Sequence, residues 1–117
     1  MKKMTFNITV TDNGNRDKPI QQEVKGFHAF DMFGFTFVVH KSYIYDKSWD
    51  VSELSTGLRV TNSQVKETAK KAIAEAIGTV TSIGMEKISE IVYMQRNRLI
   101  DAGTIKVSSL LHKSDTN

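Results

Sequence analysis

The spacing of the apolar residues changes once along this chain, near residue 61, and the change limits the possible folds. Before it, apolar and polar residues alternate, which is the pattern of half-buried strands. After it, apolar residues recur every three or four positions, as on an amphipathic helix. The first alternating run is the clearest, with apolar residues at Met4, Phe6, Ile8 and Val10. Strands followed by helices predict an α+β protein with an antiparallel sheet.

The expected sheet has four or five strands within residues 4–61. Residues 12–15 read Asp-Asn-Gly-Asn, a turn signal because Asn and Gly tolerate positive φ, and a second strand should follow Pro19. The segment 26–41 holds five phenylalanines and is expected as one central strand. In it Phe37 and Val39 should face the core, with His40 on the opposite, half-exposed face. Residues 48–54 and 58–61 are expected to add further short strands.

Residues 62–102 are predicted to be helical, as one helix or two that pack on one face of the sheet. Thr61 and Gln64 have the spacing of a capping box at the start. The first stripe contains many alanines, so its helix can approach the sheet closely. Its members are Val65, Ala69, Ala72, Ile73, Ala76, Ile77 and Val80. The second stripe contains Met85, Ile88, Val92 and Leu99. Gly103 marks its end, and 104–117 is expected as a short strand or tail.

Length and composition predict one domain that spans residues 1–117. The 16 basic and 13 acidic residues give a net charge of +3, and the absence of cysteine excludes disulfides and thiolate metal sites. No apolar run approaches the roughly 20 residues that cross a bilayer. The N-terminal residues lack the continuous apolar core of a secretory signal. We therefore expect a cytoplasmic protein without contact to a membrane.

One segment holds the residue types of a hydrolytic triad, at His40, Ser42, Asp46, Asp50 and Ser52. No serine in it stands in a nucleophile-elbow motif. The three histidines are far apart in the sequence and lack the spacing of metal ligands, and the chain has no phosphate-binding glycine loop. The sequence therefore favours a protein without enzymatic activity, metal or cofactor.

Aromatic residues with polar tips make two regions candidates for partner binding, because such side chains bury a large area with few rotors. The first is the loop 43–49, with Tyr43, Tyr45 and Lys47. Trp49 is expected in the core, and whether this loop is an interface or a lid on the core stays open. The second region lies on the last helix, with Tyr93, Arg96 and Arg98. Apolar residues on two faces of that helix also allow a homodimer.

Nucleic-acid binding is the alternative function. Lys66, Lys70 and Lys71 cluster on the first expected helix, and the aromatic sheet face offers rings for stacking. Acidic residues are interspersed with these lysines, a pattern more typical of a solvated helix face. Binding to a protein is therefore favoured over binding to nucleic acid.

Three short motifs and a helix follow one another within residues 37–77, and their order is similar to that of a known group of proteins. Val-His-Lys (39–41), Trp-Asp-Val-Ser-Glu (49–53) and Ser-Thr-Gly (55–57) precede a helix with regularly spaced alanines. In this order the chain resembles short accessory proteins encoded by phages and prophages of Gram-positive bacteria. The resemblance implies a small protein in the cytoplasm of a bacterial host that binds and inhibits a host or anti-phage defence protein, such as a CRISPR nuclease. It gives no single residue a role.

Overall fold

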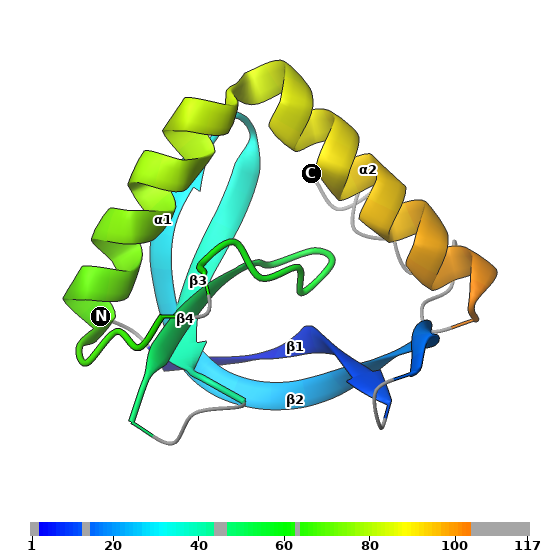
Figure 1. The fold of residues 1–117 in the computed structure, drawn as a ribbon, viewed down its shortest axis with the longest axis horizontal. Helices are drawn as coiled ribbons and strands as arrows, with labels where there is room; N and C mark the ends of the chain where they lie inside the picture. Colours follow the sequence, from blue (N-terminus) through cyan, green and yellow to red (C-terminus); the bar gives the residue numbers. More distant parts are fainter. Residues whose placement is uncertain (1–2, 13–14, 44–46, 63, 104–117) are drawn as a thin grey trace.

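The computed structural model describes residues 3–12, 15–43, 47–62 and 64–103. Four antiparallel strands form one sheet in the order β1-β2-β3-β4, and two helices follow them (Figure 1). The strands are β1 (Lys3–Asp12), β2 (Asn15–Met32), β3 (Phe35–Lys41) and β4 (Trp49–Glu53), and the helices are α1 (Ala69–Ile83) and α2 (Met85–Asp101). The predicted α+β class, with the helices after the sheet, is confirmed.

The segment expected as a single central strand is in fact a hairpin. β2 ends at Met32, which pairs with Phe35 at the start of β3. Phe33 and Gly34 between them have positive φ values of 57° and 84°. Positive φ at both central residues is typical of the two-residue turns whose twist matches that of the flanking strands. The backbone freedom of Gly34 thus divides the phenylalanine-rich segment into two neighbouring strands.

The sheet is strongly curved, and the curvature gives it two covered faces. β2 bends along its length (Figure 1), with a register shift between His28 and Phe30 of the kind that bends a strand. One face of the sheet packs against both helices, with a core that contains Phe37, Val39, Val51, Ala72, Ala76, Val80, Ile88 and Val92. On the other face, Val38 packs with Phe6 and Ile8 of β1. The predicted burial of Phe37, Val39 and Val51 is confirmed.

The start of the helical region differs from the prediction. α1 begins at Ala69, and its N-cap is Thr68, whose side chain accepts a hydrogen bond from the Lys71 backbone nitrogen. The predicted capping box is wrong, because the Thr61 hydroxyl is used within the sheet region, where it donates to Asp50 Oδ1. Residues 58–61 make one isolated bridge, Ser52 to Arg59, in place of a fifth strand.

Two helices are present, and they meet at Gly84, which has a φ of 88°. The buried faces are rotated from the predicted stripes: Ile77 is 39% exposed, and Met85 is exposed as well. The inward positions of α1 are Ala72, Ala76 and Val80, because small side chains let the helix approach the sheet, and Ile77 lies about 100° around the helix from Ala76. Neither helix among the described residues is long and apolar enough to cross a membrane. The predicted strand or tail at 104–117 lies outside the described residues.

Candidate functional site

A buried pair of polar side chains lies where β3 and β4 are paired. His40 Nε2 is 2.8 Å from Ser52 Oγ, and His40 Nδ1 is 2.8 Å from the Lys41 carbonyl oxygen. A carbonyl only accepts, so Nδ1 carries the proton and Nε2 accepts the hydrogen bond that Ser52 donates. Burial lowers the pKa of His40 below its ordinary value of 6.5, against the opposing effects of the Lys41 carbonyl and the Asp50 carboxylate. The imidazole is therefore neutral at pH 7.

The expectation of a half-exposed His40 is wrong, since the ring is 1% exposed. The reason is the curvature of the sheet, which brings β1 over this face. The Phe6 ring meets the His40 ring edge-on, with 5.6 Å between the ring centroids. An alternating pattern predicts which side of a strand a residue occupies, but it does not predict a second layer on that side.

The third member of a hydrolytic triad is not in place beside this pair. Asp50 is opposite His40 in the sheet, but its Oδ1 accepts from the Thr61 hydroxyl at 2.8 Å. Its Oδ2 lies 3.9 Å from Arg59 Nη1. The His40 Nδ1–H donates its hydrogen bond to the backbone carbonyl of Lys41, and not to this carboxylate. The arrangement thus makes Asp50, Thr61 and Arg59 one connected polar group, and His40 with Ser52 another.

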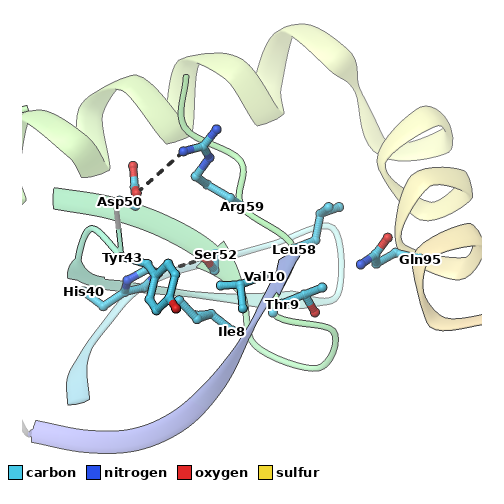
Figure 2. Close-up of a pocket in the computed structure, with 11 residues that line it drawn as sticks. Ile8, Thr9, Val10, His40, Tyr43, Asp50, Ser52, Leu58, Arg59 and Gln95 are labelled. Carbon is cyan, nitrogen blue, oxygen red and sulfur yellow. Dashed lines mark hydrogen bonds and ion pairs between the residues drawn. The ribbon is translucent and has the colours of Figure 1, made fainter. Parts of the chain in front are cut away.

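Asp50 and Arg59 of the first polar group and both residues of the second line a pocket of about 400 Å³ (Figure 2). Its apolar walls come from Ile8 and Val10 of β1 and from Leu58 in the segment after β4. Gln95 lines it from α2, and its side chain points toward the other labelled residues in Figure 2. Gln95 is only 9% exposed, and no hydrogen-bond partner for its amide is found within the described part of the chain. The pocket therefore combines apolar walls with the unpaired amide of a largely buried glutamine, whose polar atoms remain open to solvent at the pocket.

Sequence reasoning missed Gln95 and Arg59 as residues of a site. A signal for Gln95 exists in its position, three residues after Val92 and four before Leu99, on the buried stripe of α2. A polar residue at a core-facing position needs a partner or a function. No such signal exists for Arg59, whose place beside Asp50 depends on how the chain turns after β4.

The residues predicted for partner binding in the first loop are only partly placed. Tyr43 is exposed and stands at the pocket, and Lys47 is exposed too. Tyr45 lies outside the described residues. Trp49 is partly buried and packs against the core on the helix side of the sheet, with Lys41 Nζ 4.4 Å from its ring centroid. The loop therefore has an exposed residue at one end and a partly buried residue that packs against the core at the other.

On α2 the predicted residues have different environments. Tyr93 is 53% exposed, and its ring meets the Phe35 ring edge-on at 6.4 Å between centroids. The Arg96 guanidinium lies 5.4 Å from the Tyr93 centroid and donates a hydrogen bond to Ser55 Oγ at 3.0 Å. Arg96 thus connects α2 to the turn after β4, while Arg98 is exposed.

The three lysines of the alternative site do not share a surface. Lys66 precedes α1 and is 5% exposed. Its Nζ donates to the backbone carbonyl and the side-chain oxygen of Asn62 and lies 3.1 Å from Glu75 Oε2. Lys70 and Lys71 are exposed on α1. The predicted place of Lys66 on the helix is wrong, because its ammonium group is used to hold the segment before α1 against that helix.

Comparisons with known proteins identify no relative: no protein-family model, no curated protein and no solved structure matches the chain. Among the residues that the structure describes, no three or more histidine and acidic side chains converge in a way that would hold a metal ion.

Proposed function

We propose that this protein is a non-enzymatic binding module that contacts another protein through the outer side of α2. The surface concerned consists of Tyr93 and Met94, here called the α2 surface. The observation that carries the proposal is that Tyr93 is exposed and yet held in place by its neighbours. An exposed aromatic residue that is already ordered loses little side-chain entropy when a partner covers it.

The contacts of Tyr93 explain how it is ordered. Phe35 meets one edge of its ring, and the guanidinium of Arg96 lies against it, while Arg96 itself is fixed by its hydrogen bond to Ser55. Met94, the next residue, is exposed as well and has the flexible, polarisable side chain that adapts to a partner's shape. Tyrosine is among the residues that most often dominate the energy of protein interfaces.

The kind of partner follows from the resemblance to phage and prophage accessory proteins. We propose a host or anti-phage defence protein in the bacterial cytoplasm, whose activity the bound module inhibits. A CRISPR nuclease is one such partner. The alternative, nucleic-acid binding through Lys66, Lys70 and Lys71, has less support because Lys66 is buried and engaged with Asn62 and Glu75.

The test is a capture experiment followed by a functional assay. The purified protein is immobilised and exposed to a nuclease-treated lysate of a Gram-positive host with active defence systems. Captured proteins are identified by mass spectrometry and then purified for a direct affinity measurement. Tyr93→Ala and Met94→Ala should each weaken the binding of a genuine partner, by about 2 kcal/mol or more for a dominant residue. Expression of the wild-type protein should also restore plaque formation by a phage that the defended host restricts.

Met85→Ala is the matched control, because Met85 is an exposed apolar residue at the other end of the same helix. It should leave both the affinity and the plaque count unchanged. A partner whose affinity is the same for wild type, Tyr93→Ala and Met94→Ala would refute the proposed surface. Light scattering provides a second check: a dimer that Tyr93→Ala dissociates would show that the surface binds a second copy of the chain.

A further inference from the structure

The pocket beside His40 has a feature that protein binding through α2 does not require. Gln95 turns inward from the opposite side of α2, so its amide lies at the pocket and not on the α2 surface. A glutamine amide has two donors and one acceptor oxygen, and no described residue pairs with any of them. Both amide atoms keep contact with solvent at the pocket, so a ligand that displaces this solvent must supply complementary groups to be stabilised there.

The walls of the pocket favour a flat ligand with an apolar body. Ile8, Val10 and Leu58 present aliphatic side chains to it, and Tyr43 stands at it with an exposed ring (Figure 2). An exposed tyrosine ring is a stacking surface for a planar heterocycle. A volume of about 400 Å³ lies within the range of roughly 300–1,000 Å³ that is typical of small-molecule sites.

The polar groups at the pocket favour an uncharged ligand. The carboxylate of Asp50 is compensated by Arg59 and by the hydroxyl of Thr61. His40 and Ser52 satisfy each other through their hydrogen bond. Besides the remaining donors of the Arg59 guanidinium, whose side chain is 39% exposed, the amide of Gln95 is left to select the ligand, and it pairs best with a donor and an acceptor on the same edge of the ligand.

We propose that this pocket binds a nucleobase, with the Gln95 amide on its hydrogen-bonding edge and the Tyr43 ring on its face. Glutamine pairs with a nucleobase edge through two hydrogen bonds in known complexes with nucleic acids. The base can belong to a free nucleoside or to a single strand, because both present the same edge and the same flat face. This site is separate from the α2 surface and does not depend on the proposed protein partner.

The experiment is a titration of the ¹⁵N-labelled protein with adenosine, guanosine, cytidine and uridine, followed by NMR. At least one nucleoside should bind with a Kd on the order of 0.1 mM, as the usual ligand efficiency of such a compound predicts. It should shift the side-chain amide signals of Gln95. Short single-stranded oligonucleotides of the preferred base form the second arm. Tighter binding of the oligonucleotide would identify a strand as the source of the base, and equal binding would identify the free nucleoside.

Three variants test the role of the named residues. Gln95→Leu should weaken binding by about tenfold or more, whereas Gln64→Leu, at an exposed glutamine outside the pocket, should not. Leu58→Trp should abolish binding by filling the pocket, and it serves as a second test if Gln95→Leu does not fold. The absence of saturable binding by every nucleoside and oligonucleotide would overturn the proposal. Binding that is unchanged in both Gln95→Leu and Leu58→Trp would overturn it equally.

Discussion

The backbone nitrogen of Thr9 donates a hydrogen bond to the carbonyl oxygen of Gly57 over 3.0 Å. Thr9 belongs to β1 and Gly57 to the turn after β4, so the bond connects the two edges of a sheet in which these strands are farthest apart. The connection is possible because the sheet is curved and because Gly57 has no side chain. A Cβ atom on Gly57 would lie 2.6 Å from both Ile8 Cα and Thr9 N.

Gly57→Ala should therefore destabilise the protein. The φ of Gly57 is +70°, a conformation that alanine adopts only with strain, and the new methyl group would push β1 away. We expect the free energy of unfolding to fall by about 2 kcal/mol or more, as measured by urea denaturation. Gly78→Ala is the matched control: it lies within α1 with no atom near its Cβ position and should stabilise the helix by about 1 kcal/mol. Equal effects of the two substitutions would contradict the close approach of β1.

Phe37→Ala tests the core on the helix side of the sheet. Phe37 is fully buried and stacks on Phe30 with 4.7 Å between the ring centroids. Truncation should lower the free energy of unfolding by about 3–5 kcal/mol. Ile77→Ala should change it by less than about 0.5 kcal/mol, because the structure places this side chain on the exposed side of α1. A large loss of stability for Ile77→Ala would instead support the buried helix face expected from the sequence, on which Ile77 lies.

Stability should depend on pH through His40. Burial lowers the pKa of His40 in the folded protein, whereas the unfolded chain titrates near 6.5. As the pH falls through 6.5, the unfolded chain takes up a proton that the folded protein does not yet bind. The free energy of unfolding therefore decreases until the pH is below the folded-state pKa.

His40→Gln removes this titration and keeps an acceptor for the Ser52 hydroxyl. Unfolding curves of the variant should show a flatter dependence on pH between about pH 5 and 7 than those of the wild type. His28→Gln, at a half-exposed histidine paired with Asp31, should keep the steeper dependence. A wild-type stability that rises on acidification over this range would show that His40 is protonated in the fold.

Lys66 should behave as a structural residue. Lys66→Met removes the donor to the Asn62 carbonyl and the cation beside Glu75 Oε2, while Glu75 Oε1 still accepts from the Asn62 backbone nitrogen. We therefore expect a loss on the order of 2 kcal/mol in the free energy of unfolding. Lys70→Met, at an exposed position on α1, should change it by less than about 0.5 kcal/mol. Thermal melts of both variants make the comparison, and equal Tm values would mean that Lys66 is not held as the structure shows.

Phosphate-driven binding of random double-stranded DNA or RNA should be absent at physiological ionic strength, where the Debye length is about 8 Å. The two exposed lysines on α1 provide little of the charge density that releases counterions from a phosphate backbone, and Lys71 lies 3.4 Å from Glu67. A fluorescence-anisotropy titration with labelled random duplexes, whose bases are paired and cannot enter the Gln95 pocket, measures this directly. Micromolar binding that the double substitution Lys70→Glu and Lys71→Glu abolishes would instead favour the nucleic-acid function.

Several features of the fold could be predicted from the sequence because they depend on neighbours along the chain. The alternation of Met4, Phe6, Ile8 and Val10 is a local property of a strand, and the change to helical spacing near residue 61 is a local property too. These patterns were enough for the α+β class and the order of strands and helices. They also placed Phe37, Val39 and Val51 together in the core.

The candidate site could not be predicted in the same way, because its residues meet only after the sheet has curved. His40 is buried since Phe6, 34 positions earlier in the sequence, covers its ring. Lys66 is buried since its ammonium group reaches Glu75 on α1. Gln95 reaches the pocket only because α2 packs beside the turn after β4. An apolar residue every two positions in a strand, or every 3.6 positions in a helix, specifies the side of the element that a residue occupies. The curvature of the sheet and the rotation of the helices decide what lies opposite that side.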